Sequence, residues 1–93
     1  MSRYHFHQED GRSYPDEQGL ELPSMQAAHT AALRMLIEMV QENEPEFWAS
    51  GSWRMIVTDH RGLALFCLDL SATHAAAGAR ACAHPPEAGH GAP

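Results

Sequence analysis

The stretch PSMQAAHTAALRMLIEMVQENEP, residues 23–45, decides the fold. Ser24 stands where an N-cap belongs, because its hydroxyl can accept a hydrogen bond from a free N–H in a first helical turn. Pro45 disfavours continuation of a helix, and the interval between these two residues has no internal Gly or Pro. Ala, Leu, Met, Glu and Gln dominate it, and all are good helix formers. The stretch therefore predicts one long central helix.

The apolar side chains of this helix cover a wide arc at the helical period of about 100° per residue. The centre of the arc comprises Met25, Ala28, Ala32, Met35, Leu36 and Met39. Leu33, Ile37 and Val40 extend it to one side, beyond the stripe that one small sheet would cover. Either the helix lies between two surfaces, or this flank contacts a second chain. We interpret the Met residues as core, and the three flanking residues as interface candidates.

Upstream of the helix, the sequence predicts a β-hairpin. Residues 3–8 alternate between apolar and polar side chains, the period of a strand with one buried face. Asp10-Gly11 follows, a strong hairpin signal, and residues 12–14 form a short return strand before Pro15 interrupts it. The chain then turns at residues 16–19 and enters the helix.

Downstream of the helix, a second hairpin is predicted. After a connection in which Phe47 and Trp48 are expected to fold back onto the core, residues 52–59 are rich in strand formers. Residues 59–62 fit a tight turn that ends in Gly62 with a left-handed conformation. Residues 63–70 form the last strand, which is apolar on both faces and so is expected to be central or covered on both sides.

The predicted architecture is α+β, with two β-hairpins packed on one long central helix in the order β-β-α-β-β. Leu63 and Leu65 in the last hairpin are further interface candidates, since a single helix leaves one side of that strand without a cover. Residues 1–71 are expected to form one small domain. Residues 72–93, rich in Ala, Gly, Pro and His, predict a disordered C-terminal tail.

Composition limits the classes of partner. The 93 residues carry a formal net charge of −6, and no basic stripe is present to displace counterions from a nucleic acid. An anionic membrane surface is disfavoured for the same reason. No apolar run approaches the length of a membrane span, and no hydrophobic signal region opens the chain. The two cysteines, Cys67 and Cys82, form no metal-binding pair and no expected disulfide. A cytoplasmic location is therefore expected.

Several short motifs together resemble a known family. They are Tyr4-x-Phe6-His7, Asp10-Gly11, Asp16-x-x-Gly19-x-Glu21-Leu22-Pro23 before the Ala-rich helix, Trp53, and Val57-Thr58-Asp59-x-x-Gly62. Across residues 3 to 70 the chain resembles a family of short bacterial proteins of unknown function. His5 and Ser24 depart from its usual pattern. The resemblance implies a small α+β domain, and it implies no activity, cofactor or catalytic residue.

His5 and His7 lie two residues apart on a predicted strand and so share a face, which suits two ligands of a metal site. His60 is a weak third candidate, because no spacing rule brings it to the other two. We interpret the pair as solvent-facing histidines of an edge strand. The carboxylates of Asp10, Asp16 and Glu21 suit turns and the helix start better than acid–base chemistry.

The sequence therefore contains no catalytic motif and predicts no cofactor. The first hypothesis is a non-enzymatic protein-interaction or regulatory module that acts as a homodimer or binds another protein. The second is a metal- or small-ligand-binding protein that uses His5 and His7. The third is an antitoxin-like regulator of a protein partner, from the layout of a hairpin, a Pro15-Asp16-x-x-Gly19 turn and a helix. This third hypothesis is an analogy of fold alone.

Overall fold

The computed structural model of the protein describes residues 1–75, so most of the predicted tail, residues 76–93, lies outside the described residues. The described chain has five strands and two helices. They are β1 (Ser2–Glu9), β2 (Ser13–Tyr14), β3 (Leu20–Leu22), α1 (Met25–Glu42), α2 (Glu44–Ser50), β4 (Ser52–Thr58) and β5 (Ala64–Ser71). The α+β class predicted from the sequence is confirmed.

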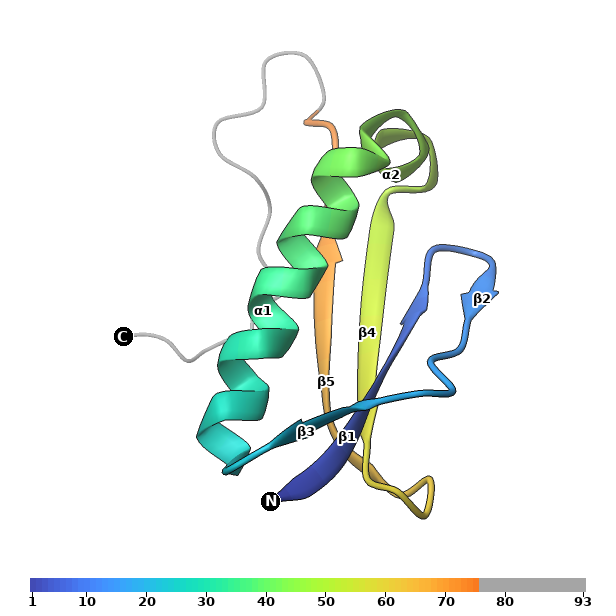
Figure 1. Cartoon of the computed structure of the whole chain (residues 1–93). Helices are drawn as coiled ribbons and strands as arrows, with labels where there is room; N and C mark the ends of the chain where they lie inside the picture. Colours follow the sequence, from blue (N-terminus) through green and yellow to red (C-terminus); the bar gives the residue numbers. More distant parts are fainter. Residues whose placement is uncertain (76–93) are drawn as a thin grey trace, which may run out of the picture.

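The strands form one antiparallel sheet with the order β2-β1-β4-β5, and β3 pairs with the start of β1 (Figure 1). The predicted order of two hairpins around a helix is therefore incomplete. Residues 20–22, expected only to anchor the chain, are a strand of their own. The two hairpins also share one sheet, because β1 pairs directly with β4 from His5↔Thr58 to Glu9↔Arg54.

Helix α1 begins as the sequence predicts, and its end differs. The Ser24 hydroxyl accepts the Ala27 N–H at 3.1 Å, as an N-cap should. After Asn43 the chain starts a second short helix, α2, which the sequence analysis did not predict. Pro45 lies in the first turn of α2, where a missing N–H costs nothing. Gly51 ends α2 with a φ of 81°, and donates its N–H to the Phe47 carbonyl at 2.7 Å.

The hydrophobic core lies between α1 and one face of the sheet. Ala28 and Ala32 of α1 are 0 % exposed, and these small side chains let the helix approach the sheet closely. The other buried apolar side chains are Tyr4, Phe6, Leu36, Phe47, Trp53, Met55 and Val57. Those of β1 and β4 alternate along their strands, as a sheet with one covered face requires. Phe47 does fold back onto the core, whereas Trp48 remains 51 % exposed.

Strand β5 is an edge strand, so the first alternative for the last strand, a central position, was wrong, and a cover on both sides by a partner or the tail stays a prediction. It pairs only with β4, and among the described residues no element lies on its other side. Phe66 and Leu68 are half-buried on the helix-covered face, while Leu65 and Cys67 are exposed. One apolar face of β5 is therefore partly buried under α1, and the other apolar face is exposed.

Candidate functional site

His5 and His7 lie on the sheet face opposite α1. Their neighbours in β1, Tyr4 and Phe6, are buried under the helix, and alternate side chains of a strand point to opposite faces. The two imidazole rings stack with centroids 6.1 Å apart and planes 10° from parallel. Both rings are half-buried, and β1 is paired on both sides. The prediction of a shared face is confirmed, and the prediction of an edge strand was wrong.

Asp16 connects this histidine pair to the loop before β3. Its backbone N–H donates to Nδ1 of His7, and its carbonyl lies 3.0 Å from Nδ1 of His5. Its carboxylate accepts backbone N–H groups from Phe6, at 3.1 Å, and from Gln18 and Gly19. One residue thus fixes the loop to β1 through both its backbone and its side chain.

These bonds determine where each ring carries its proton. Nδ1 of His7 accepts an N–H and so carries no proton, which places the proton of the neutral ring on Nε2, 3.1 Å from Oγ1 of Thr58. Nδ1 of His5 faces a carbonyl oxygen, which can only accept, so His5 carries its proton on Nδ1. Both nitrogens of His7 are therefore occupied by bonds within the fold, and neither is available to a metal ion.

The surroundings of Asp16 also shift its acidity. Partial burial raises the pKa of the Asp16 carboxyl group, but the backbone N–H groups of Phe6, Gly19 and Gln18, together with the nearby His5, lower it by more. The pKa of Asp16 therefore lies below its ordinary value of 3.8. A carboxylate that accepts two N–H groups of its own loop and one of β1 holds the turn against the strand.

His60, the third weak metal candidate, lies in the exposed turn between β4 and β5. The turn is organised by Asp59, whose Oδ1 accepts the N–H groups of Arg61 and Leu63 at 2.8 and 3.0 Å. The hydrogen bond from the N–H of Leu63 lowers the pKa of Asp59. Desolvation raises this pKa, and the N–H of Arg61 lowers it further, so that it lies below its ordinary value. Within residues 1–75, no three His, Cys, Asp or Glu side chains are placed to hold a metal ion together.

The carboxylates of Asp10 and Glu21 also make contacts within the fold. Asp10 accepts the N–H of Arg12 at 3.1 Å in the β1–β2 turn. Glu21 forms an exposed ion pair with Arg3 on the neighbouring strand, at 3.3 Å. The structure does not bring Asp10, Asp16 and Glu21 together as one set; each holds a different local contact.

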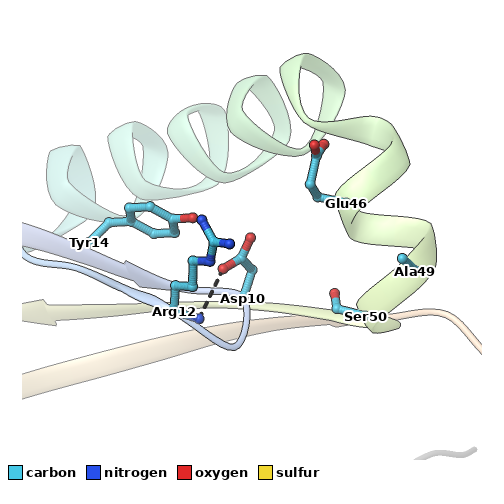
Figure 2. Close-up of a pocket in the computed structure, with 6 residues that line it drawn as sticks. All are labelled: Asp10, Arg12, Tyr14, Glu46, Ala49 and Ser50. Carbon is cyan, nitrogen blue, oxygen red and sulfur yellow. Dashed lines mark hydrogen bonds between the residues drawn. The ribbon is translucent and has the colours of Figure 1, made fainter.

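A shallow pocket of about 390 Å³ lies between the β1–β2 hairpin and α2. Figure 2 shows Asp10, Arg12 and Tyr14 of the hairpin on one side, and α2 on the other. The α2 residues that line it are Glu46, Ala49 and Ser50. The Tyr14 ring stacks on Trp53 at a centroid distance of 6.3 Å, so the hairpin is fixed against the core. Sequence reasoning missed this pocket, because α2 was not predicted.

The interface candidates are mostly exposed. Leu33 is 53 % and Ile37 46 % exposed on α1, and with Thr30, Arg34 and Glu38 they line a surface hollow of about 310 Å³. Leu63 is 57 % and Leu65 37 % exposed at the start of the last strand. Val40 differs, because it is partly buried against the core. That these residues form an interface stays a prediction.

Within residues 1–75, the outer edge of β5 pairs with no other strand, a feature that the sequence analysis missed. The His29 ring lies edge-on to Phe66 of β5, with centroids 4.7 Å apart, so the flank of α1 that contains His29 adjoins this strand. At about 100° per residue, Leu33 and then Ile37 continue from His29 in the direction away from the buried Ala32, so both are exposed. We call Leu33, Ile37 and the edge of β5 the β5-side surface.

Comparison with known proteins gives the family and no activity. Neither of the described helices is long and apolar enough to cross a membrane. No curated protein and no solved structure matches the chain. The profile of one family matches residues 3–71, which include every described strand and helix except the first residue of β1. The resemblance found from the sequence motifs is thereby confirmed, and the chain belongs to the family described as Domain of unknown function (DUF6894).

Proposed function

We propose that the protein is a non-enzymatic protein-interaction module that acts as a homodimer through its β5-side surface. The observation that supports this function is the difference between the two edges of the sheet. One edge is made of β2 and β3, which have two and three residues. The other is β5, which has eight residues and a single charge, Asp69. Monomeric proteins usually protect long edge strands with charges, Pro or a covering segment, because open edges pair with other chains.

Exposed apolar side chains surround this open edge. Leu33 and Ile37 are exposed on α1, whose His29 contacts Phe66 of this strand, and Leu63 and Leu65 lie at the N-terminal end of the strand. A contact surface that combines an open strand edge with apolar side chains offers both backbone hydrogen bonds and hydrophobic burial to a partner.

A second copy of the chain is the partner that suits this surface. An antiparallel strand pair can be formed by one strand and its own copy around a two-fold axis, which is the commonest symmetry of soluble oligomers. The net charge of −6 disfavours contact between most parts of two copies, whereas β5 carries only one of the acidic residues. Burial of this surface would also enlarge a small core.

The polar groups that come together elsewhere support a non-enzymatic role. His5, His7 and Asp16 direct their polar atoms at one another and at the backbone, and so stabilise the loop before β3. Their chemistry is that of a structural network, in which each bond fixes a turn or a strand.

Native mass spectrometry of the full chain tests the proposal. We expect the unmodified protein to be a dimer without added mass, and Ile37→Asp and Leu65→Asp to be monomers with unchanged circular dichroism. A charge on this surface would have to lose its hydration in the contact. Leu20→Asp is the matched control, because Leu20 is 42 % exposed at the opposite edge and should leave the dimer intact. A monomeric unmodified protein, or folded variants that all remain dimeric, would contradict the proposal.

A further inference from the structure

Building on the proposed dimer, we infer that two copies pair β5 with β5 in antiparallel fashion, with the two-fold axis passing at Leu68. The sheet would then continue from one copy into the next in the order β2-β1-β4-β5-β5-β4-β1-β2. Helix α1 of each copy would cover the same side of the joint sheet.

Symmetry first limits the possible registers. Residues directly opposite each other in an antiparallel pair have side chains on the same face. A two-fold axis that relates two antiparallel strands is perpendicular to the sheet and leaves the faces unchanged. Because side chains alternate along the strand, the axis must pass at a residue and not between two residues. Only four central positions need comparison, namely Phe66, Cys67, Leu68 and Asp69.

The irregularity at the start of β5 disfavours the first two positions. Phe66 lies opposite Val57 of β4, and Ala64 lies opposite Thr58, so Leu65 is an extra residue without a counterpart. Such a bulge bends and twists its strand. An axis at Phe66 or Cys67 would place this bulge within the centre of the new ladder.

Charge and side-chain pairing decide between the remaining two positions. An axis at Asp69 would place the two Asp69 carboxylates directly opposite each other, which is destabilising. An axis at Leu68 instead places Leu68 opposite its own copy and Phe66 opposite the partner's Leu70. All three are apolar, and Leu70 is 37 % exposed without a partner.

The residues on the face of β5 opposite α1 also pair favourably in this register. Cys67 would lie opposite the partner's Asp69, whose carboxylate already accepts a hydrogen bond of 2.7 Å from Arg54 Nε of its own chain. The regular part of β5 thus pairs with itself completely, without two like charges facing each other.

Disulfide cross-linking measures this register directly. Residues directly opposite have Cα atoms about 4.5–5.5 Å apart, within the range of a disulfide, whereas diagonal neighbours lie about 7–8 Å apart. One full-length chain would retain Cys67 as its only cysteine, through Cys82→Ser. The other would carry Cys67→Ser, Asp69→Cys and Cys82→Ser. Each chain alone and the mixture would be oxidised with copper phenanthroline and analysed by non-reducing electrophoresis and mass spectrometry.

We expect the mixture to give a linked heterodimer at least about ten-fold faster than either chain gives a linked homodimer, since only the mixed pair lies directly opposite. Ser13→Cys in a chain without other cysteines controls for random collision, because Ser13 is exposed on β2 at the opposite edge.

The other outcomes separate the register from the dimer. Fastest linkage of the Cys67-only chain to itself would place the axis at Cys67, and fastest self-linkage of the Asp69→Cys chain would place it at Asp69. Either result overturns the register. If native mass spectrometry shows a dimer but no chain links faster than the Ser13→Cys control, the dimer uses another surface. This inference and the assignment of the contact to the β5-side surface are then wrong, while the homodimer itself stands. A monomer would overturn both proposals.

Discussion

The backbone N–H of Asp16 donates a 3.0 Å hydrogen bond to Nδ1 of His7. Through the other ring nitrogen, the same imidazole reaches Oγ1 of Thr58, fifty-one positions further along the chain. His7 thereby connects the loop before β3, strand β1 and the end of β4. The histidine that suggested a metal ligand in the sequence is a cross-link within the fold.

The first prediction concerns the tautomers of the stacked pair. We expect long-range proton–nitrogen NMR spectra at neutral pH to show His7 with its proton on Nε2 and His5 with its proton on Nδ1. The reason is that His7 accepts an N–H at Nδ1, whereas His5 donates to a carbonyl at Nδ1. The exposed His60, which has no such restraint in the described residues, serves as the reference. A His7 proton on Nδ1 would contradict the network.

The second prediction is that Asp16→Ala lowers the free energy of unfolding by about 1–3 kcal/mol at pH 7, because backbone N–H groups lose their acceptor. The loss should depend on pH. The pKa of Asp16 is lower in the folded protein than its ordinary value of 3.8, so its stabilising effect is full above that value. The effect disappears as the pH falls through the folded pKa, where folding must proceed with a neutral carboxyl group.

Denaturant titrations of both proteins between pH 7 and pH 2 measure this difference. Glu17→Ala is the control, since Glu17 is an exposed acidic neighbour and its change should be close to neutral. A penalty for Asp16→Ala that stays constant down to pH 2 would show that the charge of Asp16 has no role in stability.

The third prediction compares two glycines with similar backbone angles. Gly19 has a φ of 74°, and a Cβ there would lie 2.9 Å from the Arg3 side chain, the His5 ring and the Tyr4 carbonyl. Gly62 has a φ of 87° and nothing within 4 Å of such an atom. Both Ala variants carry the left-handed strain of roughly 1–2 kcal/mol, and Gly19→Ala must also displace backbone. Thermal denaturation should therefore show a clearly larger loss for Gly19→Ala; equal losses would refute the close approach.

The fourth prediction tests the core between α1 and the sheet. Met55 is 0 % exposed at the centre of β4, so Met55→Ala should destabilise the protein by about 2–5 kcal/mol through lost burial and a cavity. Met25 is 41 % exposed, and Met25→Ala should change stability by no more than about 0.5 kcal/mol. Urea denaturation of the two variants gives the comparison. Similar losses in both would mean that β4 is not the centre of the core.

Local features were predictable wherever neighbouring residues determine them. The start of α1 at Ser24 and the turns that end in Gly19 and Gly62 follow from side-chain and glycine chemistry over a few positions. Helix α2 was missed because Pro45 was interpreted only as the end of a helix. The same residue suits a first turn equally well, and Asn43 makes the break between the two helices.

The site depended on contacts between distant residues, and here the sequence was less informative. Alternation placed His5 and His7 on one face, but nothing local pointed to Thr58 or to the Asp16 backbone as their partners. The interface candidates on α1 followed from the helical period, which did not show that Val40 is partly buried against the core.

By itself, the sequence determined the α+β class, the long helix and the hairpin turns, because periodicity, capping and turn chemistry act over short distances. Its short motifs also determined the membership of the family. Only the tertiary structure decided that β1 lies beside β4, and that β5 is therefore left at an edge. An apolar strand has the same composition at the centre of a sheet as at an edge that another chain covers. The position of the strand depends on the free energy of pairing with each possible neighbour. That free energy comes from contacts between residues that lie far apart in the chain.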